Sequence, residues 1–301
     1  MKKLLTLLLG LLILVSSPPA VSPRPARLKI ITTIFPLREF AKEIAADRGE
    51  VSLLLPPGAG VHTWQPRASD IVRLSSADLV IQVGAGLEPW IHGLIKSVSS
   101  PKLRVLAVAD SLSLEEHTDQ EGGKREPDPH VWLDFGQDMV IADLIAAELS
   151  AIEPSSASLF QAGAARLKGR LEKLDAAYSQ GLGRCASRAL IIGGHAAFGY
   201  LAKRYELEQL SLSSLSPDAE ALPGRLMSTI DWGKEHGVRA VFAEANTTPR
   251  MAEVLAKELH AEVLVLHTAS NLTKKEWESG RTFFDIMEEN LMNLRRGLAC
   301  E

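Results

Sequence analysis

Short apolar runs alternate with helical patterns along most of this chain, and this alternation restricts the fold more than any other feature. In the first half the runs are Leu28–Phe35, Val51–Leu55, Leu79–Val83 and Leu103–Val108. In the second half they are Ala189–Ile192, Leu207–Leu212, Ala240–Ala243 and Glu262–Leu266. Strands that alternate with helices predict a parallel sheet covered by helices. The nearly continuous apolar character of the runs suits sheets that are buried on both faces.

One long helical pattern separates the two halves. After Pro154, apolar side chains recur at spacings of three, four or seven: Phe160, Leu167, Leu171, Leu174, Tyr178 and Leu182. A helix of this length would span roughly 40 Å, the width of a whole domain. We therefore expect two α/β lobes joined by one spine helix. The N-terminal lobe is assigned to residues 26–150, the linking helix to 151–184 and the C-terminal lobe to 185–301.

The first twenty residues have the pattern of a secretory signal. Lys2 and Lys3 precede the apolar run Leu4–Val15, and small residues and prolines follow. The run is shorter than the ~20 apolar residues of a membrane-spanning helix; a buried first helix or an uncleaved anchor is the alternative. No cysteine lies near its end, so we expect no lipid anchor there. These features predict a signal peptide over residues 1–20 and a soluble protein in a periplasm-like compartment.

Composition and charge exclude several classes of protein. Hydrophobic residues make up 46% of the chain, enough for a core. The formal net charge of −4 offers no basic excess that would attract nucleic acid or anionic lipid. The two cysteines, Cys185 and Cys300, exclude a disulfide-dense scaffold and a zinc ribbon with paired CxxC motifs. An oxidising compartment permits a disulfide between them, with two free thiols as the alternative.

Four of the eight histidines follow predicted strands. His62, His130, His195 and His267 lie in loops after strands, two in each half. Ligands of open α/β sheets bind beyond the carboxyl ends of the strands, so these side chains would converge if the lobes face each other. Neutral imidazole is a ligand of tetrahedral Zn²⁺. We therefore predict a metal site between the lobes, although each histidine taken singly is also compatible with an ordinary surface or core role.

The other four histidines have simpler explanations. His92 lies on a predicted helix, and His236 and His260 end helices, where a partly cationic side chain interacts favourably with the helix dipole. His117 lies in the polar segment 115–128, which we expect to be an exposed loop. A transient metal contact at His117 is the less favoured alternative.

Several sequence blocks resemble one known family. They include TTIFPLREFAKEIA, DPHVWLD, GGHAAFGYLAKRY and AEVLVLHTASN, and together the matching blocks cover almost all of the mature chain. They are similar to the periplasmic metal-binding proteins of zinc and manganese ABC importers, the ZnuA-like and TroA-like group. The resemblance implies two Rossmann-like lobes, each a parallel sheet flanked by helices, joined by a long helix. It also implies one bound Zn²⁺, a monomer, and partners consisting of a membrane permease and its cytoplasmic ATPase.

The resemblance also suggests the ligands. His62, His130 and His195 correspond to the three histidine ligands, and His195 favours zinc because manganese relatives often have Glu there. His267 departs from the pattern, because relatives usually have Asp at that position. Four histidines would suit Zn²⁺ or Cu²⁺ and make Mn²⁺ less suitable. Alternatively, His267 points away, and water or a carboxylate such as Glu244 completes the coordination.

Two carboxylates are candidates for orienting the ligands. Asp134 and Glu244 could each accept the second N–H of a ligand histidine; ordinary capping or surface roles are the alternative. We expect acid to weaken metal binding, because protons compete for imidazole near its reference pKa of ~6.5.

The leading functional hypothesis is a periplasmic zinc-binding protein that is not an enzyme. The alternatives are a Mn²⁺ or Cu²⁺ carrier and a three-histidine zinc hydrolase with Glu244 as the base. A cell-surface adhesin on the same fold would need a surface anchor, which we do not find in the sequence.

Overall fold

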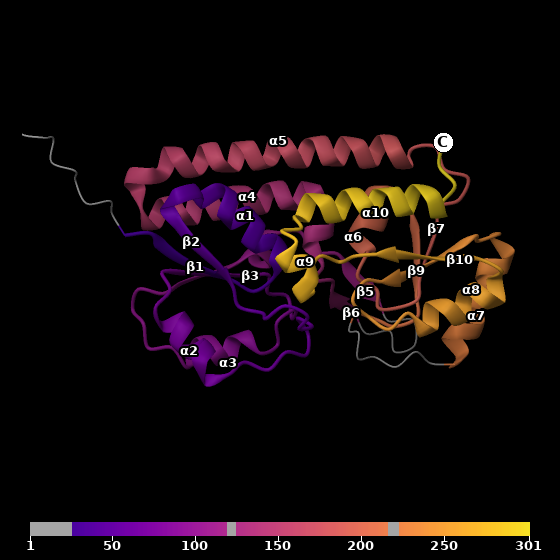
Figure 1. The fold of residues 1–301 in the computed structure, drawn as a ribbon, viewed down its shortest axis with the longest axis horizontal. Coiled ribbons are helices and arrows are strands. Elements are labelled where there is room, and N and C mark those ends of the chain that lie inside the picture. The colour runs from indigo at the N-terminus through magenta and orange to yellow at the C-terminus, as the bar shows by residue number, and fades with distance from the viewer. Residues whose placement is uncertain (1–25, 119–124, 216–222) are drawn as a thin grey trace, which may run out of the picture.

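The computed structural model describes residues 26–118, 125–215 and 223–301, so the expected signal peptide lies outside the described residues. Two lobes lie side by side, and each contains a four-stranded parallel sheet. Long helices run along one side of the molecule and extend over both lobes (Figure 1). The predicted class, two α/β lobes joined by a long helix, is confirmed.

The N-terminal sheet has the strand order β2-β1-β3-β4. Its strands are β1 (Leu28–Thr32), β2 (Gly49–Leu53), β3 (Leu79–Gln82) and β4 (Arg104–Ala107). The helices between them are α1 (Phe35–Ala45), α2 (Ala68–Ser75) and α3 (Ile91–Lys96). Helix α1 lies on the side of the long helices, and α2 and α3 lie on the opposite side (Figure 1). The apolar strands are therefore covered on both faces, as their composition predicts.

The C-terminal sheet repeats this order as β10-β9-β7-β8. Its strands are β7 (Ala189–Ile192), β8 (Glu208–Ser211), β9 (Ala240–Glu244) and β10 (Glu262–Leu266). Its helices are α6 (Gly199–Arg204), α7 (Pro223–Glu235), α8 (Arg250–Leu259), α9 (Lys274–Glu278) and α10 (Phe283–Gly297). In both lobes the first strand lies between the second and the third. The ends of the first and third strands therefore flank the point where the strand order reverses, which is where ligands bind in such sheets.

Two helices form the centre of the structure. Helix α4 (Phe135–Ile152) packs against the 26-residue helix α5 (Ala157–Leu182), and a 3-10 turn over Pro154–Ser156 separates them. The break lies at Pro154, because a proline disfavours helical backbone in the preceding residue, here Glu153. The spine helix therefore begins at Ala157, a few residues later than the predicted linking segment 151–184.

Helix α5 approaches its neighbours closely. A Cβ atom added at Gly163 would lie 2.7 Å from the Ile44 backbone of α1, so this contact requires glycine. Phe40 of α1 packs edge-on against Phe283 of α10, with ring centroids 5.2 Å apart. The Tyr178 hydroxyl of α5 donates a hydrogen bond to the Met287 carbonyl. One buried core thus extends across both lobes and fixes them to the same helices.

Two segments differ from the sequence prediction. The sequence after β10 has a helical pattern from about residue 273 to 298, which predicts one helix. The structure has two, because α9 ends before Gly280, which has a positive φ, and Thr282 caps α10. The polar segment 115–128 contains a two-stranded antiparallel hairpin, β5 (Glu116–Thr118) and β6 (Arg125–Pro127). A hydrogen bond from the Asp128 N–H to the Glu115 carbonyl closes the base of the hairpin.

The C-terminus is joined to the start of the second lobe. Cys185 and Cys300 form a disulfide, and the backbones beside them form an antiparallel bridge.

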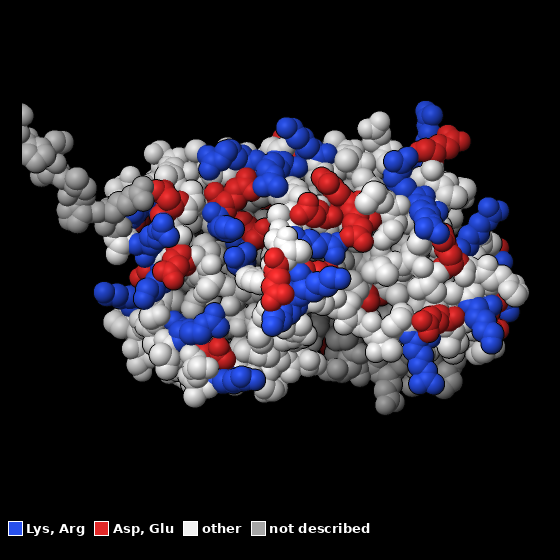
Figure 2. Space-filling model, viewed as in Figure 1, with Lys and Arg blue, Asp and Glu red and all other residues white. Residues whose placement is uncertain are grey.

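Lysine and arginine alternate with acidic side chains over the face in Figure 2. Within the described ranges, the helices are all too short or too polar to cross a membrane.

Candidate metal centre

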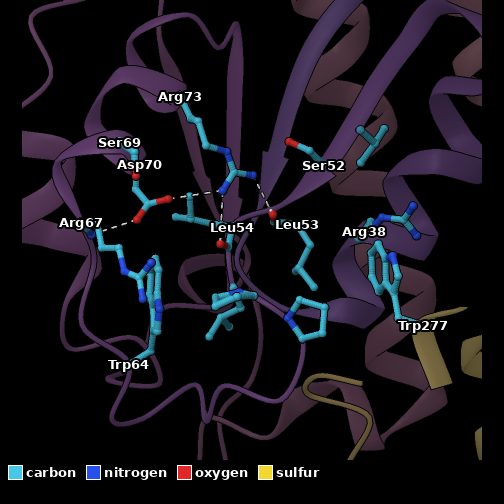
Figure 3. Close-up of a pocket in the computed structure, with 14 residues that line it drawn as sticks. Arg38, Ser52, Leu53, Leu54, Trp64, Arg67, Ser69, Asp70, Arg73 and Trp277 are labelled. Atoms are coloured by element: carbon cyan, nitrogen blue, oxygen red, sulfur yellow. Dashed lines mark hydrogen bonds and ion pairs between the residues drawn. The ribbon is translucent and has the colours of Figure 1, made fainter. Parts of the chain in front are cut away.

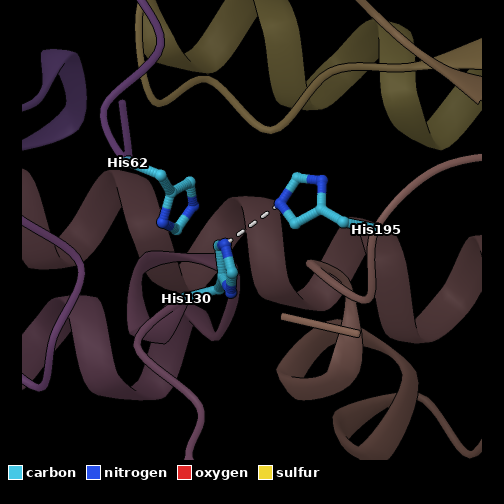
Figure 4. Close-up of side chains that lie close together, drawn as sticks. All are labelled: His62, His130 and His195. Carbon is cyan, nitrogen blue, oxygen red and sulfur yellow. Dashed lines mark hydrogen bonds between the residues drawn. The ribbon is translucent and has the colours of Figure 1, made fainter. Parts of the chain in front are cut away.

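Three of the four predicted histidines meet between the lobes. One ring nitrogen from each of His62, His130 and His195 lies within 4.8 Å of the others, and this is the one such group among the described residues. The ring centroids are 5.2–5.7 Å apart. The three rings come from different segments and point toward a common centre (Figure 4). The fourth predicted histidine, His267, lies outside this group.

The loop that carries His62 is held by side chains that bond its backbone carbonyls. The loop after β2 is bound by Asn271, whose side-chain nitrogen donates to the carbonyls of Pro56 and Ala59. On the other side, the Trp90 indole N–H donates to the Val61 carbonyl at 2.7 Å. Asn271 follows β10 in the sequence, so the C-terminal part of the chain helps to position the first histidine of the N-terminal lobe.

His130 is oriented by a residue that the sequence analysis did not identify. Its Nδ1 lies 2.8 Å from Oδ1 of Asp128, which also accepts the His130 backbone N–H. An ionised carboxylate only accepts, so Nδ1 carries the proton and Nε2 keeps its lone pair for a metal. Asp128 is in turn held by the Tyr200 hydroxyl, which donates to its carbonyl. The sequence feature that could have identified Asp128 is its position two residues before His130, in Asp-Pro-His.

His195 follows β7 at the point where the C-terminal strand order reverses. A Cβ atom at Gly193 would lie 2.5 Å from the Ala252 backbone, so glycine allows the loop to pass close to α8. Glu244 ends the neighbouring strand β9, and its Oε2 lies 2.6 Å from Nδ1 of His195. Glu244 therefore occupies the position of an orienting carboxylate and leaves Nε2 of His195 directed at the group.

Asp134 does not have the orienting role considered for it. Its Oδ1 accepts the backbone N–H groups of Gly136 and Gln137 and so caps α4. The same oxygen accepts from Arg204 at 2.8 Å. Asp134 directly precedes a helix, where a carboxylate satisfies unpaired N–H groups, so its contacts favour the capping alternative.

His267 is engaged by its own surroundings. Its Nδ1 accepts the Ala269 backbone N–H at 2.8 Å, so the neutral ring carries its proton on Nε2. That Nε2 lies 3.2 Å from the Asn246 side-chain amide and 3.5 Å from Glu276 Oε1. The single lone pair of the neutral ring is thus taken by Ala269, and Nε2–H can donate to Glu276 but not to the amide nitrogen of Asn246, which is itself a donor. These contacts favour the alternative in which His267 points away from the metal.

Burial favours the neutral form of His62, His130 and His267. Desolvation, and then the neighbouring His130 and His195, lower the pKa of His62 to about 3. Desolvation also lowers the pKa of His130, although Asp128 opposes the shift. The pKa of His267 is lowered by desolvation as well. Neutral imidazoles can coordinate a metal without first losing a proton.

The histidine group opens into a cavity of about 260 Å³. His267, Thr268 and Ser270 line this cavity. Glu244 and Asn246 line both it and a second cavity beside it. A larger cavity of about 440 Å³ lies beside β2 in the N-terminal lobe (Figure 3). Its one lining carboxylate, Asp70, pairs with Arg73. The chemistry for metal binding therefore lies in the smaller cavity.

The fold and this histidine group together are those of a two-lobed binding protein with a candidate metal site between its lobes. Residues 30–297 match the model of the ZnuA family, described as "Zinc-uptake complex component A periplasmic". The chain belongs to this family, and the resemblance inferred from its sequence blocks is confirmed.

Individual relatives agree with the family match. The zinc-binding protein AdcA of Streptococcus pyogenes serotype M18 is 32% identical over 287 residues, which are 89% of this chain and 56% of that protein. This chain thus spans little more than half the length of the AdcA relatives. The high-affinity zinc uptake system protein ZnuA of Bacillus subtilis is 31% identical over 90% of this chain and 88% of its own length. The crystal structure of Zn(II)-bound AdcA from Streptococcus pneumoniae superposes with a TM-score of 0.77 at 31% identity, over 92% of this chain and 59% of that one.

Proposed function

We propose that this protein binds one Zn²⁺ ion between its lobes through His62, His130 and His195 and delivers it to an ABC importer. The observation that carries the proposal is a group of three imidazoles whose ring nitrogens converge, two of which are oriented by carboxylates. The family match and the names of the relatives support zinc as the cargo.

The spacing of two ring nitrogens suits a single ion. Two Zn–N bonds of about 2.0–2.1 Å at a tetrahedral angle place their nitrogens about 3.3 Å apart. The Nε2 atoms of His130 and His195 are 3.3 Å apart. His62, from the same lobe as His130, approaches this centre as well (Figure 4). A small movement of the His62 loop would then complete a set of three nitrogen ligands.

The donor set favours zinc over manganese. Imidazole nitrogens suit Zn²⁺ and Cu²⁺, whereas Mn²⁺ prefers carboxylate, carbonyl and water oxygens. Asp128 and Glu244 are bonded to histidines, so neither offers both of its oxygens freely to a hard cation. Cu²⁺ remains the competing cation, because it binds such ligands more tightly than Zn²⁺ does.

A zinc hydrolase is the second candidate. It is favoured by the position of His267, which leaves the fourth coordination position to a ligand from solution. Hydrolysis also needs a general base close to that ligand. Glu244, the candidate base, already accepts from His195 at 2.6 Å. The arrangement therefore supports binding better than catalysis.

We further propose that the protein acts as a periplasmic monomer after removal of a signal peptide over residues 1–20. Its partners would be a membrane permease and the ATPase that drives it. The family description supports the periplasmic location.

The test is the metal content of the purified mature protein, followed by competition among Zn²⁺, Mn²⁺ and Cu²⁺ with a chelator that sets the free metal concentration. We expect one zinc per chain and no manganese binding at equal free concentration. Hydrolysis of a 4-nitrophenyl ester by the zinc-loaded protein should not exceed that by His195→Ala. A preference for Mn²⁺, or zinc-dependent turnover, would contradict the proposal.

A further inference from the structure

The donor for the fourth coordination position is not supplied by the described residues in their present arrangement. Tetrahedral Zn²⁺ needs four donors, and His62, His130 and His195 provide three. The Nδ1 of His267 accepts from Ala269, and its Nε2–H faces Glu276. Asp128 and Glu244 lie behind the imidazoles that they orient. The fourth donor therefore comes from solution, through the cavity that the histidines line.

The cavity has room for more than one water molecule. Its volume is about 260 Å³, whereas a water molecule occupies about 30 Å³ in the liquid. Among the described residues that line it, none is a lysine or an arginine, so the metal itself would be the main cationic centre. An oxygen ligand larger than water can thus reach the metal without displacing a side chain.

The same cavity contains a pair of hydroxyl groups with an unused donor. Oγ1 of Thr268 and Oγ of Ser270 lie 3.2 Å apart, and both residues line the cavity. One hydroxyl donates to the other, which leaves the second O–H of the pair without a described acceptor. Thr268 is only 5% exposed. Ser270 is half-buried, and whichever hydroxyl keeps the spare O–H is stabilised by an acceptor that enters the cavity.

We propose that the protein carries zinc together with a small carboxylate anion, such as acetate, which occupies this cavity. One carboxylate oxygen bonds the metal as its fourth donor, and the other accepts a hydrogen bond from the Thr268–Ser270 pair. A metal-bound water is chiefly a donor and a poor acceptor, whereas the second carboxylate oxygen accepts the spare O–H of the pair, which is why a two-oxygen ligand fits better. This inference rests on the proposed zinc binding and specifies the form in which the cargo is held.

The test measures zinc affinity at buffered free Zn²⁺ while sodium acetate replaces sodium perchlorate at constant ionic strength. The protein loaded with Co²⁺ is titrated in parallel, because its visible absorption bands report the ligands of the metal. We expect the zinc dissociation constant to fall by about tenfold and the Co²⁺ bands to shift to saturation. Ser270→Ala should reduce this response, whereas Ser75→Ala on the exposed side of α2 should retain it.

Two results would overturn the inference. One is a zinc affinity and a Co²⁺ spectrum that acetate leaves unchanged; the other is a full acetate response in Ser270→Ala. The backbone carbonyl of Ser270, which accepts the Phe35 N–H, is retained in that variant, so the fold does not depend on the hydroxyl. Absence of zinc binding both with and without acetate would instead contradict the proposed function.

Discussion

The carboxylate of Glu244 lies 2.6 Å from Nδ1 of His195, and the two residues come from the ends of adjacent strands. Strand β7 leads to the histidine and β9 ends in the glutamate, so the sheet itself sets their separation. This relationship fixes the tautomer of His195 and directs Nε2 toward His62 and His130. Asp128 likewise lies behind His130, with its Oδ1 2.8 Å from Nδ1 of that ring.

We predict that Glu244→Gln weakens zinc binding by about 10- to 100-fold, the usual cost of losing a partner behind a ligand histidine. The amide keeps the size of the side chain but no longer offers a charged acceptor for the Nδ1 proton. Chelator competition measures the effect. Glu262→Gln, at the start of β10 and paired with Arg296 on the surface, is the matched control. Equal zinc affinities in the two variants would contradict the orienting role.

Zinc affinity should resist mild acid. Three histidines with the ordinary pKa of ~6.5 would together lose up to about a thousandfold in affinity per pH unit below that value. The pKa of His62 is lowered to about 3, and that of His130 is also lowered, so protons compete less for these two imidazoles than for ordinary histidines. We expect a fall of about tenfold or less between pH 6.5 and 5.5. We thus expect the protein to release zinc at a lower pH than ordinary histidines would. A thousandfold fall in zinc affinity between pH 6.5 and 5.5 would contradict this account.

The metal-free protein should lose stability over the same range of pH. Below about 6.5 an unfolded chain protonates its histidines, whereas folded His62 takes up its proton only near pH 3. The free energy of unfolding therefore falls as pH decreases from about 6.5 toward 3. Urea unfolding at several pH values checks this, and His62→Gln should show a weaker dependence. An identical dependence in the variant would show that His62 does not contribute.

Asp138 is buried in α4, and neither of its carboxyl oxygens has a described partner. Burial, and then the nearby Asp134, raise its pKa well above the ordinary value. The unfolded chain loses this proton above pH ~3.9, so ionisation destabilises the fold as pH rises through the folded pKa. We predict that Asp138→Asn increases the free energy of unfolding at pH 7.5 by about 1–3 kcal/mol. Asp143→Asn, on the exposed side of α4, is the control, and a destabilised Asp138→Asn would show that the carboxyl has a structural role.

The disulfide should contribute a substantial part of the stability. It joins residues that are 115 positions apart, so it restricts a long loop of the unfolded chain. We predict that the double variant Cys185→Ser/Cys300→Ser loses about 2–5 kcal/mol of unfolding free energy. Denaturant unfolding measures this, and a reducing agent should lower the midpoint of the natural protein but not that of the variant. No difference between the two proteins would contradict the contribution.

The sequence predicts the fold and three members of the histidine group because both depend on local patterns. Strands that alternate with helices define parallel sheets, and a residue just after such a strand lies at the edge where ligands bind. His195 illustrates this, since its position follows from the end of β7 alone.

The remaining features depend on contacts between distant segments. His267 also follows a strand, but Asn290 of α10 binds its backbone N–H and carbonyl, and Ala269 occupies its Nδ1. Asp128 and Asp134 are both close to His130 in the sequence, and only the hairpin and the start of α4 decide which one meets the ring. These choices are made by tertiary packing, which the spacing of residues does not reveal.

The most direct test of the three-histidine site is a zinc titration of two variants, His195→Ala and His267→Ala, with His92→Ala on exposed α3 as the control. The account predicts that His195→Ala loses tight zinc binding, by about a hundredfold or more for the loss of one ligand with its orienting partner. His267→Ala should bind one zinc per chain with an affinity close to that of His92→Ala. Equal losses in His195→Ala and His267→Ala would contradict the account and establish a site of four histidines.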